Sequence, residues 1–100
     1  MKFFRNGKAF EPEYDKICVL YDPQNGQVIH IHEVVIPPGG RKVDDNGVET
    51  RTFQQAANLG KDTSKLKALH VLPKDIERGS PYKVDLKSIK LVKIQRAKEQ

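Results

Sequence analysis

The chain has 100 residues, of which 37% are hydrophobic, so it holds enough apolar material for one modest core and not for two. Residues 1–60 contain 7 basic and 8 acidic side chains, whereas residues 61–100 contain 11 basic and 5 acidic ones, so the net positive charge belongs to the C-terminal part. No apolar run approaches the ~20 residues of a membrane-spanning helix, and the single cysteine, Cys18, excludes an intrachain disulfide and favours a reducing, cytoplasmic location.

The first 14 residues are expected to form an arm or a small hairpin. Asn6 and Gly7 stand between short apolar segments, and this dipeptide readily adopts the positive φ angles of a tight turn. Pro12 then removes a backbone donor and favours an extended connector. The main domain is therefore predicted over residues 15–95, and the polar tail at 96–100 is expected to fray because it has no apolar anchor.

Two segments rich in β-branched residues, 15–22 and 27–36, predict the main hairpin. Between them, Pro23 presets φ for a type I turn, and Gly26 accepts the left-handed conformation that closes a four-residue loop. With this loop, Asp22 faces Gln27, Val19 faces His30, Ile17 faces His32 and Cys18 faces Ile31. A loop of three or five residues would move Cys18 to the other face of the hairpin.

The segment 37–49, PPGGRKVDDNGVE, predicts a mobile loop because it is rich in proline, glycine and charge. Its DDNG stretch lacks the ligand spacing of a calcium loop and is interpreted as a plain turn. A short helix is expected next. Thr52 and Gln55 have capping-box spacing, Gly60 is placed to end the helix, and Phe53, Ala56 and Ala57 share one helical face.

The C-terminal part predicts further strands. KLKALHVLP, residues 65–73, favours a strand that stops at Pro73, although ALHVL is also compatible with a helix. A single helical turn ending at Gly79 follows, and KVDLKSIKLVKI, residues 83–94, gives two short strands around a turn at 86–88. The expected fold is α+β in ββαββ order: an antiparallel or mixed sheet of about four strands, with one short helix on one face and the N-terminal hairpin as an extra element.

Two of the three histidines, His30 and His32, stand two residues apart on a predicted strand and therefore share a face. A zinc site needs at least a third protein ligand, and His70 on another strand is the best candidate, because the expected register puts Cys18 on the opposite face and alternation excludes Glu33. A metal site at these histidines, or a metal-independent nuclease that uses them, is one hypothesis. Half-exposed histidines on a solvated sheet face are the commoner explanation.

The basic residues near the C-terminus suggest a second hypothesis. A phosphate-binding stripe would consist of Lys83, Lys87, Lys90, Lys93, Arg96 and Lys98. Lysines that solvate an outer strand and discourage edge-to-edge pairing explain the same pattern. An aromatic platform for bases is not evident, because Tyr82 is the only aromatic residue after Phe53.

The leading hypothesis is a small non-enzymatic module that binds another protein, chosen because the sequence yields no assembled catalytic constellation. Its alternatives are the basic nucleic-acid-binding domain and, third, the histidine-dependent metal site or nuclease. No cofactor and no membrane partner are expected, and the oligomeric state stays open.

Overall fold

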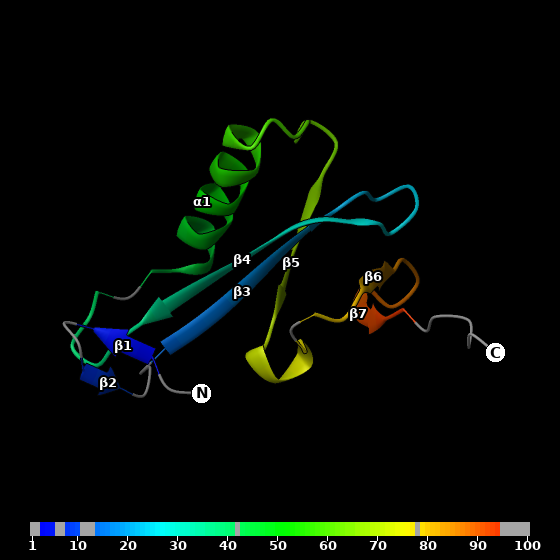
Figure 1. Cartoon of the computed structure of the whole chain (residues 1–100). Coiled ribbons are helices and arrows are strands. Elements are labelled where there is room, and N and C mark those ends of the chain that lie inside the picture. The colour runs from blue at the N-terminus through cyan, green and yellow to red at the C-terminus, as the bar shows by residue number, and fades with distance from the viewer. Residues whose placement is uncertain (1–2, 6–7, 11–13, 42, 78, 95–100) are drawn as a thin grey trace.

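A computed structural model describes residues 3–5, 8–10, 14–41, 43–77 and 79–94 (Figure 1). It confirms the α+β class. Within these ranges, one α-helix accompanies seven strands in three antiparallel sheets: the hairpin β1–β2, a central sheet in the order β4-β3-β5, and the hairpin β6–β7. No helix in the described ranges has the length and apolar character needed to cross a bilayer.

The N-terminal strands are β1 (Phe3–Arg5) and β2 (Lys8–Phe10), which pair antiparallel as the expected hairpin does. The turn predicted at Asn6 and Gly7 lies outside the described residues, as does the tail at 96–100. The predicted loop at 37–49 is too long at its C-terminal end, because the helix already begins at Asp45.

The main hairpin consists of β3 (Tyr14–Tyr21) and β4 (Val28–Ile36). The four-residue loop is confirmed: the Asp22 amide donates to the Gln27 carbonyl at 2.9 Å, and the Gly26 amide donates to the Asp22 carbonyl at 2.8 Å. Gly26 has a φ of 78°, the left-handed conformation that glycine adopts without strain.

The register beyond this loop differs from the prediction by one residue. Tyr21 pairs with Val28 but Leu20 pairs with His30, so Ile29 is an extra residue on β4 and forms a β-bulge. The carbonyl of Ile29 accepts a hydrogen bond from Lys61 Nζ at 2.6 Å. As a consequence, Cys18 faces His32 and not Ile31, and the prediction that Cys18 lies on the face opposite the histidines is wrong.

The N-cap of helix α1 (Asp45–Asn58) lies eight residues before Thr52, the N-cap that the capping-box spacing predicts. Asp44 is the true N-cap, since its Oδ1 accepts from the Gly47 amide at 2.7 Å, and the DDNG stretch is therefore the first turn of the helix. The predicted end at Gly60 is confirmed. Gly60 has a φ of 84° and its amide donates to the Ala57 carbonyl at 2.9 Å.

Helix α1 packs on one face of the central sheet. Its buried side chains follow a spacing of four residues, Val48, Thr52 and Ala56, and they meet Cys18 and Leu20 of β3. Thr52 is fully buried inside the helix, where its hydroxyl donates to the Val48 carbonyl at 2.6 Å. At the helix start, an ion pair between Lys16 and Asp45 lowers the pKa of the Asp45 carboxyl.

The remaining elements are β5 (Lys67–Val71), the short 3-10 helix η1 (Pro73–Asp75), β6 (Tyr82–Asp85) and β7 (Lys90–Lys93). β5 completes the central sheet, as predicted, but β6 and β7 form a sheet of their own and do not extend it. This hairpin is joined to the β3–β4 loop, because the Val84 amide donates to the Gly26 carbonyl at 2.8 Å and Gln27 bridges to Lys83. Figure 1 shows α1 and the β6–β7 hairpin on opposite sides of the central sheet.

Candidate functional site

All three histidines lie on the face of the central sheet that α1 covers. His30 Nε2 lies 2.8 Å from Gln55 Oε1 of the helix, and His70 Nε2 lies 2.9 Å from Glu49 Oε1. His32 on β4 and His70 on β5 each pair directly with Cys18 on β3, so the three side chains form a row across the sheet. His30 and His32 do share a face, as alternation predicts.

This row does not form the expected metal site. Cys18 lies between the two histidines and is fully buried under α1 next to Thr52. In the ranges that the structure describes, no three His, Cys, Asp or Glu side chains are placed to hold one ion. A Glu49 carboxylate can only accept, so His70 Nε2 donates to it, and the buried Nδ1 has no hydrogen-bond partner among the described residues.

The Cys18 thiol is held in its neutral form. Burial raises its pKa, and the nearby carboxylates of Glu49 and Asp45 add to this, while a hydrogen bond with the Thr52 side chain partly opposes it. A reactive cysteine needs a lowered pKa and access to solvent. Cys18 has neither, so it acts as a packing residue.

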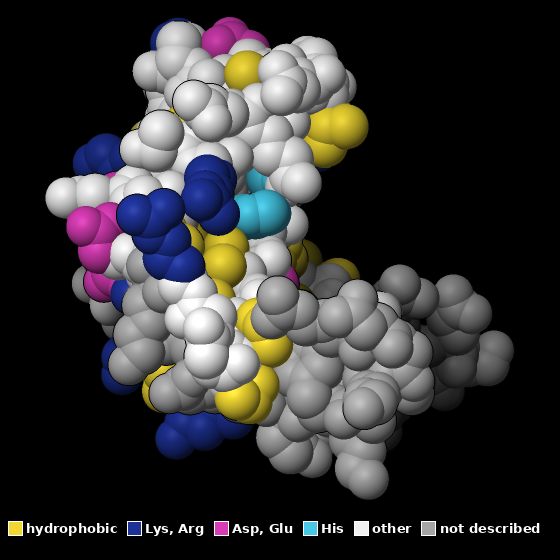
Figure 2. Space-filling view, turned by 90° about the vertical axis from the view of Figure 1, so that its left-hand side faces the viewer, with side chains coloured by type: hydrophobic (Ala, Val, Ile, Leu, Met, Phe, Trp, Pro, Cys, Tyr) yellow, Lys and Arg dark blue, Asp and Glu magenta, His cyan; other side chains and the backbone are white. Residues whose placement is uncertain are grey.

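The basic residues proposed for phosphate binding divide between two faces of the β6–β7 hairpin. Lys83 and Lys90 alternate onto one face, whereas Lys93 lies on the other and pairs with Glu77 at 2.7 Å. Lys87 is in the connecting turn, and Arg96 and Lys98 lie outside the described residues. Figure 2 shows the side of the molecule that lies at the left in Figure 1, away from the β6–β7 hairpin. Lys and Arg side chains lie on that side, with acidic side chains beside them.

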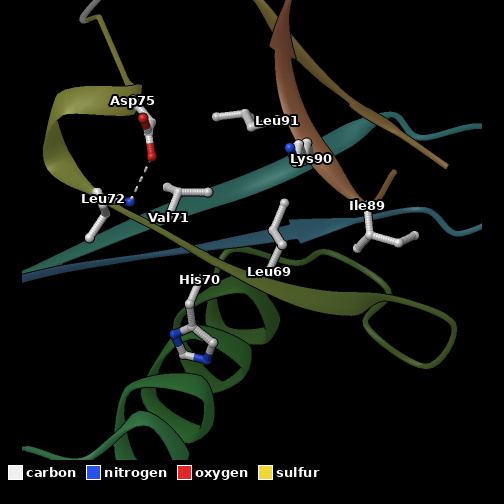
Figure 3. A pocket seen from close by; sticks show the side chains of 8 residues that line it. All are labelled: Leu69, His70, Val71, Leu72, Asp75, Ile89, Lys90 and Leu91. Atoms are coloured by element: carbon white, nitrogen blue, oxygen red, sulfur yellow. Dashed lines mark hydrogen bonds between the residues drawn. The ribbon is translucent and has the colours of Figure 1, made fainter. Parts of the chain in front are cut away.

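A groove lies between β5 and β7, and no local sequence pattern indicates it. Its apolar lining comes from both strands and the residues next to them: Leu69, Val71, Leu72, Ile89 and Leu91. Asp75 and Lys90 add the charged side chains, and the backbone of His70 completes the wall. Figure 3 shows Leu69 and Val71 on the side of β5 that faces β7, while the His70 ring points away toward α1.

The groove is small and open, and both apolar and charged side chains line it. Its volume is about 270 Å³, below the about 300–1,000 Å³ of typical small-molecule sites, and it suits one or two side chains of another chain. Leu72 is 56% exposed and Ile89 is 45% exposed, although both are large apolar residues. Ile89 also has a φ of 52°, which holds the end of the β6–β7 turn in a conformation that β-branched residues rarely adopt.

Both walls of the groove are edge strands. Among the described residues, β5 pairs with β3 on one side and stands at the end of the central sheet, and β7 pairs with β6 alone. The alternation of KALHV places Lys67, Leu69 and Val71 on the groove face and Ala68 and His70 on the helix face. Sequence reasoning found the two strands; it did not find the groove, because nothing local indicates that β7 comes to lie across from β5.

Comparisons of the chain with protein-family models, with curated proteins and with solved structures find no match in any of the three. Function is therefore inferred from the geometry of the chain itself.

Proposed function

We propose that this protein is a protein-binding module and that a segment of its partner binds in the groove between β5 and β7. The observation that carries this is the groove lining: five apolar side chains from two separate strands and their flanks line one open cleft, and they are Leu69, Val71, Leu72, Ile89 and Leu91. Exposed apolar surface of this kind, with charged residues at its rim, is typical of protein interaction sites.

The small volume favours a protein partner over a metabolite. A cleft of about 270 Å³ accepts a side chain or two and leaves no room for a nucleotide-sized ligand. On the helix-covered face the central side chains Cys18, Leu20, Val48 and Ala56 are fully buried. Binding at the groove needs no rearrangement of that packed side.

The test is selection of a random dodecapeptide library, displayed on phage, against the folded protein. Binding of the selected peptides is then measured to two variants, Leu72→Glu and Leu59→Glu. Both leucines are exposed, but Leu72 lines the groove and Leu59 caps the far end of α1, 64% exposed. A buried charge at the interface should weaken binding by about tenfold or more in Leu72→Glu and leave Leu59→Glu unchanged.

Two results would contradict this function. One is a failure to select any peptide, or equal binding by both variants. The other is a titration with short RNA or DNA that shifts the amides of residues 83–94 and fades as salt rises, because phosphate contacts depend steeply on salt and an apolar groove does not. The second result would favour the nucleic-acid alternative.

A further inference from the structure

If the proposed function holds, the open backbone edge of β5 indicates how the segment of the partner binds. β5 stands at the end of its sheet, and no hydrogen bond to the backbone of residues 67–71 comes from any described residue other than those of β3. Alternate residues of a paired edge strand direct their amide and carbonyl groups away from the sheet. An extended segment alongside β5 would hydrogen-bond to these groups, which is the strand-addition mode of peptide recognition.

The side chains of such a segment would alternate between the groove and the helix face. Those on the groove face would lie next to Lys67, Leu69 and Val71, which share that face at a spacing of two. Leu91 and Ile89 line the groove from the β7 side (Figure 3). Two apolar residues two positions apart would therefore fill the groove beside Leu69 and Val71.

Charge distinguishes the two ends of the groove. Lys67 lies at the start of β5, and Lys90 lies at the same end as Leu69 and Ile89 in Figure 3, whereas Asp75 lies at the other end beside Leu72. Lys67 and Lys90 are both exposed, and neither has an ion pair with a described residue. The groove-lining residues fall between Leu69 and Leu91, within the part of the sequence, residues 61–100, that carries the excess of basic residues. An acidic side chain is favoured at the Lys67 end and disfavoured at the Asp75 end.

The direction of the added strand follows from the sheet. Every strand pair in the described residues is antiparallel, and antiparallel pairing is slightly more stable per residue. An antiparallel segment would meet Val71 first, then Leu69, and then Lys67. We infer that the groove between β5 and β7 takes an extended acidic segment of the pattern apolar-x-apolar-x-acidic, bound as an antiparallel strand to β5.

The experiment uses a labelled synthetic peptide, Gly-Thr-Val-Thr-Val-Thr-Glu-Gly with blocked ends, and measures its binding by fluorescence anisotropy and by amide shifts of the protein. The reversed order, Glu-Thr-Val-Thr-Val, and the same peptide with Lys in place of Glu are expected to bind about three- to fivefold more weakly, as a single cross-strand charge contact implies. Shifts are expected at residues 67–71 and 90–93.

Two N-methylated versions of the peptide test the backbone pairing. One carries methyl groups on the amides of the valines and the glutamate, the other on those of the threonines. Only one of these sets faces β5 in an antiparallel strand, so one version should lose about tenfold in affinity and the other much less. Equal binding by both methylated peptides and the parent would overturn strand addition.

A charge reversal tests the direction of the strand. Lys67→Glu should reverse the preference between the Glu and Lys peptides, and the matched variant Lys65→Glu, an exposed lysine before the strand, should not. No reversal in Lys67→Glu would overturn the acidic pattern. The inference fails while the proposed function stands in one case. In that case Leu72→Glu abolishes the binding of library peptides, but neither N-methylation of the peptide nor Lys67→Glu changes the binding. If no peptide binds, both fail.

Discussion

The two faces of the central sheet are covered to different extents. On the helix face, a 14-residue helix lies along β3, and Cys18, Leu20, Val48 and Ala56 are excluded from solvent. On the other face, Ile17, Val19 and Tyr21 of the same strand are buried, but the flanking strands are not fully covered: Ile31 of β4 is 42% exposed, and the groove opens beside β5. Both faces thus bury the central strand. The flanking strands β4 and β5 are half-buried on the helix face, whereas the other face also carries the exposed Ile31 and the open groove.

The short length of the β6–β7 hairpin explains why the two faces of the central sheet are covered to different extents. β6 and β7 have four residues each, which is about 13 Å of strand, and they are anchored at the β3–β4 loop through Gly26 and Gln27. From that anchor the hairpin lies to one side of the central sheet and does not pair with β5. The hairpin face therefore leaves the large apolar side chains of Leu72 and Ile89 exposed at the groove. Substitutions on the two faces should accordingly act on different properties.

The largest effect on stability is expected from Leu20→Ala, on the helix face. Leu20 is the largest of the fully buried side chains, and truncating such a leucine costs about 2–5 kcal/mol in lost burial and residual cavity. Leu72→Ala is the matched change on the groove face, where an exposed side chain costs about 0.5 kcal/mol or less. Guanidinium denaturation of both variants measures the difference. Equal losses would mean that the groove is part of the core.

Gly26→Ala should detach the hairpin from the sheet. A Cβ at Gly26 would lie 2.2 Å from the Val84 carbonyl oxygen, which is backbone and cannot move without breaking the Val84–Gly26 hydrogen bond. Gly39→Ala is the control, because Gly39 has nearly the same φ, 76°, and nothing near its Cβ position. The control should lose about 1 kcal/mol of stability and Gly26→Ala at least about 2 kcal/mol.

Amide spectra would show where the Gly26→Ala damage lies. Shifts are expected through residues 82–93 and at the groove, while the amides of α1 keep their positions. Changes spread evenly over both faces would contradict the idea that the hairpin is docked on the sheet as a separate unit.

Local sequence signals predicted the elements of this fold well. DPQNG predicted the loop length of the main hairpin, Gly60 predicted the end of the helix, and alternation placed Glu33 away from the histidines, opposite Ile17. The helix start was missed because Asp44 caps the helix through a stretch that also looks like a turn. Tertiary packing of Val48 and Thr52 extends the helix over residues that propensity alone assigns to a loop.

The candidate site was less accessible to prediction. The bulge at Ile29 shifts the register by one residue, and it is held by Lys61, a residue 32 positions away. No sequence pattern within the hairpin indicates that Lys61 hydrogen-bonds to the Ile29 carbonyl. The groove depends in the same way on two strands meeting across space, so the sequence supplied Leu69, Val71 and Leu91 as strand residues without showing that they face one cleft.

The reaction rate of the Cys18 thiol reports whether the helix face of the central sheet is closed to solvent. The structure places its thiol under α1, fully buried, with burial raising its pKa. An aromatic disulfide reagent should therefore react at a rate limited by unfolding, and quickly once guanidinium unfolds the chain. Leu72→Cys in a Cys18→Ala background puts the thiol on the groove face and should react at once in the folded protein. Immediate reaction of Cys18 in the native protein would contradict its burial under α1.

The smallest expected effect comes from the exposed ion pair between Glu77 and Lys93, on the hairpin side. The Lys93 ammonium lowers the pKa of the Glu77 carboxyl, and Glu77 in turn raises the pKa of Lys93. A carboxyl with a lowered pKa in the folded state stabilises the protein above its ordinary pKa, and this contribution disappears as the pH falls through the folded-state value. Because the pair is exposed, salt should weaken it further.

Thermal unfolding of the wild type and of Glu77→Gln tests this pair. The variant should be slightly less stable near neutral pH in dilute buffer. The difference should vanish in strong acid, where the wild-type carboxyl is protonated too, and it should shrink in concentrated salt, because screening weakens exposed charges. A difference that persists in strong acid would show that the glutamine perturbs the segment before β6 in some other way. Peptide binding at the groove should change little in this variant, since Glu77 does not line it.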